Sequence, residues 1–269
     1  MFSLFIFALA MSTSMTRNEL VSWLDSYLET QRFKDYCPNG LQVEGAETVQ
    51  HIVTGVTASL ALLEAAVERG ADTVLVHHGW FWKNEDERIR GMKRKRIAYA
   101  LQHNLNLIAY HLPLDAHPEV GNNTQLARQL GFKHDLDAEG LPKGIGPSNL
   151  IQTGYLDIPE TLESLSAKIS DILQRDALTV GNPQQLIQRL AWCTGGAQGF
   201  MSEAIEAGVD LYISGEASEP TYHYACETST AYIGAGHHAT ERYGVKALGE
   251  KVAEHFKVQV EFIDLNNPI

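Results

Sequence analysis

Two adjacent histidines, His77 and His78, end an apolar run of this chain and are followed by a glycine. The run, Thr73–Val76, is typical of a buried strand, and imidazole is the commonest metal ligand in proteins. In an open α/β sheet, binding sites form at the carboxyl ends of the strands. A histidine pair alone also occurs in purely structural positions, so a metal site at this point requires further ligands elsewhere in the chain.

Two histidines further along the chain are each followed four residues later by a carboxylate, His111 by Asp115 and His237 by Glu241. On a helix this spacing places both side chains on one face, within reach of a common ion. Three or more imidazoles and two carboxylates exceed the needs of one ion, so we predict two divalent ions roughly 3.5–4 Å apart with a carboxylate bridge. These ligand types favour Zn, Fe, Mn or Ni over Ca or Mg, without choosing among the four.

The elements that must position these residues alternate between short apolar strands and amphipathic helices. This order is typical of an α/β fold with parallel strands. A segment rich in Gly, Pro and Asp, from about 131 to 159, is typical of a boundary between two lobes. The expected strands are His51–Val56, Thr73–Val76 and Leu105–Tyr110; the expected helices are Ser59–Glu68, Lys93–His103, Thr161–Leu173 and one that begins at a capping box formed by Thr16 and Glu19.

The chain also contains an internal repeat. Ile52–Gly79 and Leu190–Glu216 each read as a strand, a turn with Gly or Thr, a helix, a Gly-x-Asp and a second apolar strand. The first copy ends in the histidine pair, whereas the second ends in Gly215-Glu216. Each copy is followed by a strand that ends in a histidine, His111 or His237. Strand-helix-strand units resemble one another by chance, but agreement at two places in the same order favours duplication.

Composition limits the possible functions. With 269 residues, 44% of them hydrophobic, the chain can bury a large core. Its net charge of −12 argues against a protein that binds duplex nucleic acid, although a small phosphorylated ligand stays possible. The three cysteines are far apart and form no C-x-x-C pair, which fits a reducing cytoplasm.

The amino terminus is unusual. Phe2–Met11 resembles the core of a signal peptide, but no Lys or Arg precedes it and it is too short to span a bilayer. The helical pattern begins only after Met15. We therefore expect residues 1–14 to be an over-extended or disordered amino terminus, with Met15 as the natural start, and we expect no association with a membrane.

Several segments together resemble the YbgI family, which includes the Nif-three-like proteins and of which many members carry the name GTP cyclohydrolase 1 type 2 homolog. The resemblance extends from about Met15 to the carboxyl terminus. It implies a two-lobed α/β fold, a di-metal site and a toroidal homohexamer. We expect a first lobe of residues 15–125 plus 230–269 and a second lobe of 126–229. The segments that carry the resemblance are Pro38–Gly45, His77–Gly79, His111–Asp115 and Gly236–Glu241.

This resemblance also implies a set of metal ligands. It leaves His111 beside the metals, in contact with a ligand residue or with substrate. In Gly236–Glu241 the family's ligand corresponds to the first histidine, and His238, which lies three residues before Glu241, is its rival. The implied ligands are His77, His78, Asp115, His237 and Glu241, with the two acids as bridges.

Candidate residues for proton transfer and substrate binding are less specific. Glu216 and Glu219 follow the second copy of the repeat and could transfer protons or orient ligands, and His223 has the same standing. Surface carboxylates on an acidic protein are an equally good explanation. A basic cluster between Arg88 and Arg96 could attract phosphate, with Arg94 and Arg96 as substrate contacts, or could simply be a solvated helix face.

Aromatic residues directly follow the histidine pair. Trp80, Phe81 and Trp82 could stack on a base or could pack within the fold or between subunits. Two functions are compatible with the whole pattern. One is a di-metal hydrolase that uses metal-activated water on a nucleotide or a related phosphorylated or cyclic compound. The other is a non-catalytic hexamer that binds metal for regulation, storage or delivery.

Overall fold

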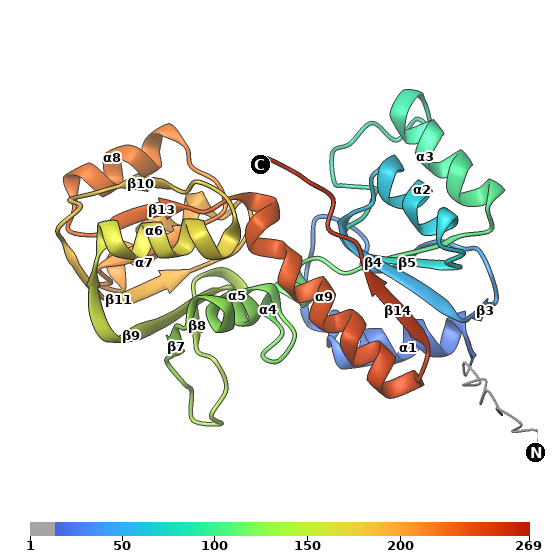
Figure 1. The fold of residues 1–269 in the computed structure, drawn as a ribbon, viewed down its shortest axis with the longest axis horizontal. Helices are drawn as coiled ribbons and strands as arrows, with labels where there is room; N and C mark the ends of the chain where they lie inside the picture. Colours follow the sequence, from blue (N-terminus) through green and yellow to red (C-terminus); the bar gives the residue numbers. More distant parts are fainter. Residues whose placement is uncertain (1–13) are drawn as a thin grey trace, which may run out of the picture.

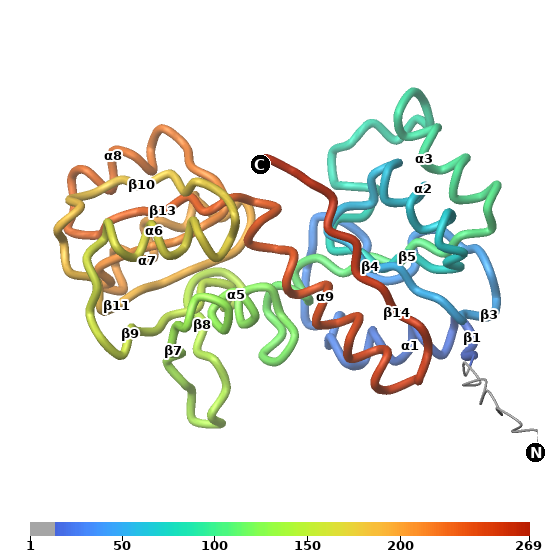
Figure 2. The backbone as a smooth tube through the Cα atoms, viewed as in Figure 1, coloured from blue at the N-terminus to red at the C-terminus, as the bar shows by residue number. Residues whose placement is uncertain are grey.

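The chain forms two α/β lobes that lie side by side (Figure 1), in a computed structural model that describes residues 14–269. The apolar stretch Phe2–Met11 lies outside the described residues, so the expected character of the amino terminus stays a prediction. Within residues 14–269, no helix has both the length and the apolar character needed to cross a membrane. The backbone trace shows that the last strand of the chain returns to the lobe that contains the first helices (Figure 2).

The first lobe is built on a five-stranded sheet with the order β14-β4-β5-β6-β2. Strands β14, β4, β5 and β6 are parallel, and only the edge strand β2 is antiparallel. The three strands expected in this part of the sequence are confirmed as neighbours in one parallel sheet. The bounds are β2 Gly40–Val43, β4 His51–Thr57, β5 Thr73–His78, β6 Asn106–Ala109 and β14 Gln259–Phe262.

Helices cover both faces of this sheet because successive strand residues point to opposite sides. Leu75 packs in a cluster with α1 and with α9 (His237–Phe256), whereas Val74 and Val76 pack with α2 and α3. Burial on both faces explains the continuous apolar run of β5. The capping box of Thr16 and Glu19 is confirmed at the start of α1. The bounds are α1 Arg17–Tyr27, α2 Leu60–Glu68 and α3 Gly91–Gln102, with a small separate sheet of β1 Met15–Thr16 and β3 Thr48–Val49.

The second lobe contains a seven-stranded sheet with the order β10-β13-β12-β11-β9-β7, to which β8 is added through β9. The expectation of a lobe boundary over 131–159 was wrong. This segment holds β7, β8 and most of β9, and its glycines and prolines lie between short antiparallel strands of the sheet. The bounds are β7 Lys133–His134, β8 Gly144–Ile145, β9 Ile151–Thr161, β10 Leu178–Val180, β11 Leu186–Trp192, β12 Leu211–Ser214 and β13 Ala231–Gly234.

Helices also cover both faces of the second sheet. Trp192 of β11 is fully buried among residues of α5 and α6, whereas its neighbours Ala191 and Cys193 pack with α7 and α8. The helix expected over Thr161–Leu173 is confirmed as α6, with Thr161 as its N-cap. The bounds are α5 Asn122–Leu130, α6 Leu162–Leu173, α7 Met201–Glu206 and α8 Glu219–Glu227.

Helix α9, His237–Phe256, connects the two lobes (Figure 1). Ala239 near its start packs in the core of the second lobe, whereas Leu248 and Val252 pack in the core of the first. The preceding strand, β13, pairs with β12 in the second sheet, although we expected residues 230–269 to belong to the first lobe. The first turn of α9 therefore lies where the two lobes meet.

The two parts of the internal repeat have the same topology. In the first lobe the order is β4, α2, β5, α3 and β6, and in the second lobe it is β11, α7, β12, α8 and β13, with all three strands parallel in each. His77 and His78 end β5, and Gly215-Glu216 follows β12. Descent from one duplicated unit stays a hypothesis that this common topology supports.

Candidate metal centre

The histidine pair lies at the carboxyl end of β5 and both rings are held by main-chain or side-chain contacts. His77 is fully buried, and its Nδ1 lies 3.0 Å from the carbonyl oxygen of Tyr110. The Nδ1 atom of His78 lies 3.4 Å from Oγ1 of Thr57. Since Nδ1 is occupied in each ring, Nε2 is the atom that each histidine presents to the site.

Asp115 approaches from α4, a short helix of residues Leu112–Ala116 that follows β6. Its carboxylate is buried, and its Oδ1 accepts hydrogen bonds from Nδ2 of Asn122 at 2.8 Å and from Oγ1 of Thr194 at 3.4 Å. Asn122 and Thr194 were missed by sequence reasoning, because neither stands in a ligand-like spacing, although Asn122 lies only seven residues after Asp115. They fix the orientation of the carboxylate.

His237 and Glu241 occupy the first turns of α9, one above the other, as the four-residue spacing predicts. Glu241 is 3% exposed. His237 is held from behind by Glu216, whose Oε1 lies 2.7 Å from Nδ1 of the imidazole. A carboxylate that orients a ligand histidine in this way is typical of metal sites.

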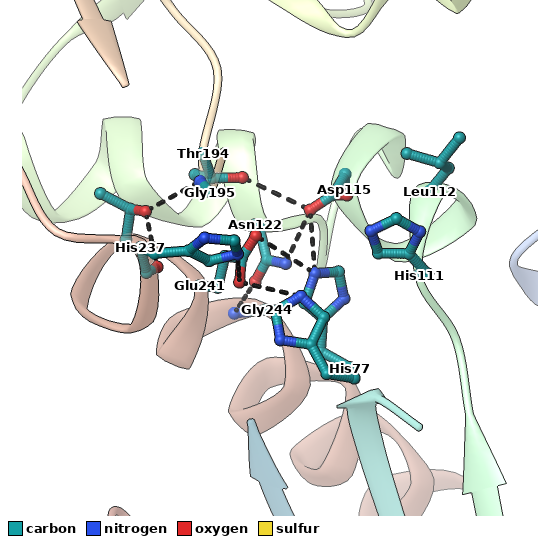
Figure 3. A network of polar contacts seen from close by, with 12 residues as sticks. His77, His111, Leu112, Asp115, Asn122, Thr194, Gly195, His237, Glu241 and Gly244 are labelled. Carbon is teal, nitrogen blue, oxygen red and sulfur yellow. Dashed lines mark hydrogen bonds and ion pairs between the residues drawn. The ribbon is translucent and has the colours of Figure 1, made fainter. Parts of the chain in front are cut away.

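These side chains form two groups of ligand atoms that share Glu241, and Figure 3 shows Asp115, His77, His237 and Glu241 turned toward one another. In one group, Nε2 of His77 lies 3.4 Å from Oε1 of Glu241 and 3.5 Å from Oδ1 of Asp115. In the other, Oε2 of Glu241 lies 3.2 Å from Nε2 of both His78 and His237. Ligand atoms about 2.1 Å from a tetrahedral ion lie roughly 3.4 Å apart, so both groups have a suitable spacing.

Two buried atoms of these groups lack a hydrogen bond among the described residues, Nε2 of His77 and Oε2 of Glu241. Leaving buried polar atoms without partners is costly. Gly195, with a φ of +69°, passes so close to the Glu241 carboxylate that a Cβ at this position would collide with it. The donor set, the unpartnered atoms and this close backbone approach all fit divalent transition metals.

The imidazoles and carboxylates of the site shift one another's pKa values. Burial opposes a charge on His77, but the carboxylates of Asp115 and Glu241 outweigh it and raise the pKa of this imidazole to about 9. Burial is likewise outweighed at His237, where the nearby carboxylates of Glu241 and Glu216 raise the pKa to about 9. Burial lowers the pKa of His78 to about 3. The surrounding imidazoles hold the pKa of Glu241 well below its usual range against the effect of burial.

We expect metal binding near pH 7.5 to release about two protons per chain, because both His77 and His237 are protonated below about pH 9 in the metal-free protein and only neutral imidazole binds metal. Titration calorimetry in buffers of different ionisation enthalpy measures this number. The release should decline above about pH 9, where the metal-free imidazoles are already neutral. A release of no protons near pH 7.5 would contradict the coupling of these ion pairs to metal binding.

His111 lies next to the two ligand groups that share Glu241 but belongs to neither of them. Its ring centre is 5.2 Å from that of His77, and with the histidine pair it forms a further set of atoms that could bind a metal. Its Nδ1, however, lies 2.7 Å from Oδ1 of Asp35, whose side chain is 3% exposed. Asn39 completes this arrangement, since its amide donates to the Asp35 carboxylate and its oxygen accepts from the main-chain N–H of His111.

The structure separates the other predicted residues into two sets. Glu216 contacts His237, and Arg96 lines the cavity described below. Glu219 and His223 lie on α8 with both side chains exposed, 4.0 Å from each other. His238, the rival to His237 as a ligand, contacts Asp264 and belongs to neither ligand group: Nε2 of His238 lies 2.9 Å from Oδ1 of Asp264. The exposed side chain of Arg94 does not line the cavity.

A cavity of about 470 Å³ opens over the ligand groups and is lined by residues of both lobes. Of the three aromatic residues after the histidine pair, only Trp82 lines it. Trp80 is buried and donates its indole N–H to the carbonyl oxygen of Ala58, so it serves packing. Tyr36 and Phe200, which the sequence reading did not single out, also line the cavity.

The fold and the site define a two-lobed α/β protein with a candidate metal centre between its lobes. The chain belongs to the Duf34/NIF3 (NGG1p interacting factor 3) family, whose sequence model matches residues 15–268. This confirms the family predicted from the motifs. The match to residues 15–268 includes both lobes and all the ligand groups.

Similar proteins agree with this assignment. The chain is 54% identical over 250 residues to a protein of Neisseria meningitidis serogroup B named GTP cyclohydrolase 1 type 2 homolog, a match that covers 93% of this chain and 98% of the relative. A protein of the same name from Pseudomonas aeruginosa is 52% identical, with coverage of 97% and 99%. The solved structure of the protein ybgI, described as of unknown function, has a TM-score of 0.88, 48% identity and coverage of 95% and 100%.

Proposed function

We propose that this protein is a di-metal-dependent hydrolase that acts on a nucleotide or a related phosphorylated or cyclic compound. The observation that carries the proposal is the sharing of Glu241 by two ligand groups at the base of a cavity. When bound, two divalent ions would lower the pKa of water toward neutrality and so supply a nucleophile. The ions would be held by His77, Asp115 and Glu241, and by His78, His237 and Glu241.

The surrounding residues would orient the ligands and the substrate. Glu216 holds His237 through Nδ1, and Asn122 and Thr194 hold Asp115. A carboxylate can only accept a hydrogen bond, so Asp35 holds the Nδ1–H of His111 and fixes the orientation of this ring at the cavity wall. The name shared by the relatives supports a cyclohydrolase reaction on a purine nucleotide, and phosphoester cleavage uses the same groups.

A second candidate function is non-catalytic metal binding in a homohexamer, for storage, delivery or regulation. The deep burial of the ligands favours it: His77 is fully buried, and Asp115 and Glu241 are 7% and 3% exposed. Such burial is typical of ions that are retained. In both cases we propose a cytoplasmic protein, because Cys37, Cys193 and Cys226 are all free thiols.

Turnover of a nucleotide panel by metal-loaded protein distinguishes the two functions. If the protein is a hydrolase, the wild type and a control with an exposed residue of α9 changed, Glu250→Gln, turn over a panel member, and the double variant His77→Ala, Asp115→Ala does not. Activity that survives the double change would rule out the metal site as its source. Transfer of metal to a metal-free enzyme without any turnover would instead support the second function.

A further inference from the structure

One cation of the basic cluster differs from its neighbours. Arg88 and Arg90 pair with Asp86, and Lys93 pairs with Glu85, so these charges are neutralised locally. Arg96, in the second turn of α3, is partly buried and lines the metal cavity. No carboxylate among the described residues pairs with its guanidinium, and its buried Nε has no hydrogen-bond partner there. A guanidinium is well suited to bind phosphate, so an unpartnered arginine at a cavity wall is suited to bind an anion.

The charge of the cavity agrees with this role. Among the described residues that line it, the only carboxylates are Asp115 and Glu241, and both belong to the ligand groups. With two divalent ions held there, the ions and Arg96 would outweigh the charge of the two lining carboxylates, although the chain as a whole carries −12. A local positive field in an acidic protein selects anionic small molecules over neutral ones.

The remaining wall of the cavity is aromatic and apolar. Trp82 is fixed by a hydrogen bond from its indole N–H to the carbonyl oxygen of Gly79, and its ring meets that of His111 edge-on at 5.0 Å. Tyr36 is 54% exposed, and Phe200 lines the cavity from the second lobe. A volume of about 470 Å³ is within the range of roughly 300–1,000 Å³ of small-molecule sites and far exceeds what a bare phosphate fills.

We propose that Arg96 forms an anion subsite in the metal cavity, and that the ligand is a small molecule with a phosphate group at Arg96 and a planar ring between Tyr36, Trp82 and Phe200. This inference rests on the proposed function, because it places the reacting part of the ligand at the metal groups. It narrows the substrate class to phosphorylated ring compounds and excludes neutral nucleosides. It also distinguishes Arg96 from the exposed Arg94.

Binding of GMP, guanosine and inorganic phosphate by calorimetry tests the subsite. We expect the wild type to bind GMP more tightly than guanosine, and Arg96→Met to weaken GMP binding about 10- to 100-fold, the usual effect of losing a hydrogen bond to a charged group. Arg96→Lys should recover part of this loss. Arg94→Met is the matched control and should bind GMP as the wild type does, since its side chain lies in solvent.

Measurements with and without metal separate this proposal from the proposed function. Dependence of GMP binding on Arg96 in the metal-free protein supports the subsite even if the loaded protein turns over nothing. Unchanged metal content in Arg96→Met shows that the variant is folded and that its ligand groups are intact. Equal affinity of wild type and Arg96→Met for GMP, or equal wild-type affinity for GMP and guanosine, would overturn the subsite.

Discussion

Replacing Glu241 with glutamine is expected to abolish binding of both metal ions, because the two ligand groups share this one carboxylate. Glutamine keeps the shape but removes the charge, and each group then retains two protein ligands with a neutral amide in place of the bridge. Loss of an outer-shell partner typically costs 10- to 100-fold in metal affinity, and we expect a larger loss here. Elemental analysis and competition with a chelator measure the number of ions and their affinity.

Two further glutamate variants test whether the loss of both ions is specific to Glu241. Glu216→Gln removes the carboxylate behind His237, so we expect it to weaken one ion by roughly 10- to 100-fold and to leave the group of His77 and Asp115 intact. Glu250→Gln changes an exposed residue of the same helix and should retain both ions. Two tightly bound ions in Glu241→Gln would show that this carboxylate is not the bridge.

Removal of metal is expected to lower the thermal stability of the protein by a large amount. The ligands come from β5, α4 and α9, so the unfolded chain cannot hold them together. An ion present at a thousand times its Kd stabilises the folded state by about 4.1 kcal/mol. For a chain of this size each kcal/mol shifts the midpoint by about 2–4 °C, so we expect roughly 8–16 °C for each ion. Thermal melts before and after chelation provide the measurement.

The stabilisation of the folded protein by bound metal should also increase with pH between about 6.5 and 9. In the metal-free protein the raised pKa values of His77 and His237 stabilise the fold below pH 6.5, and this contribution is lost as the pH rises through about 9. Metal binding becomes stronger over the same range because fewer protons must be displaced. Equal melting temperatures for chelated and loaded protein, with the metal loss verified by elemental analysis, would refute a structural contribution of the ions.

The fold could be predicted from the sequence in its first part and less well in the middle. The strands at His51 and Thr73 and the helices after Thr16 and Thr161 follow from local apolar patterns and caps, which the structure confirms. The segment 131–159 was misinterpreted because Gly and Pro mark turns within a sheet as well as linkers. Only the pairing of β7 and β8 with β9 reveals that the segment belongs to the second lobe.

The candidate site could be predicted where its residues are close in the sequence. The pair His77-His78 and the four-residue spacing of His237 and Glu241 indicate metal chemistry because strand ends and helix faces determine where such side chains point. Asp35, Asn122 and Thr194 carry no comparable signal. Each is a common polar residue in an ordinary segment, and its importance arises only from the side-chain contacts that the folded chain brings about.

The sequence by itself determined the family, the mixed α/β fold and a set of histidines and acids suited to transition metals, since these depend on motifs and local periodicity. Only the tertiary structure decided which residues meet. It brings Glu216 and Arg96 to the site, leaves Glu219 and His223 on the surface, and turns His238 toward Asp264. The reason is physical: the site lies where α9 joins two lobes, and contacts between lobes depend on packing across the whole chain.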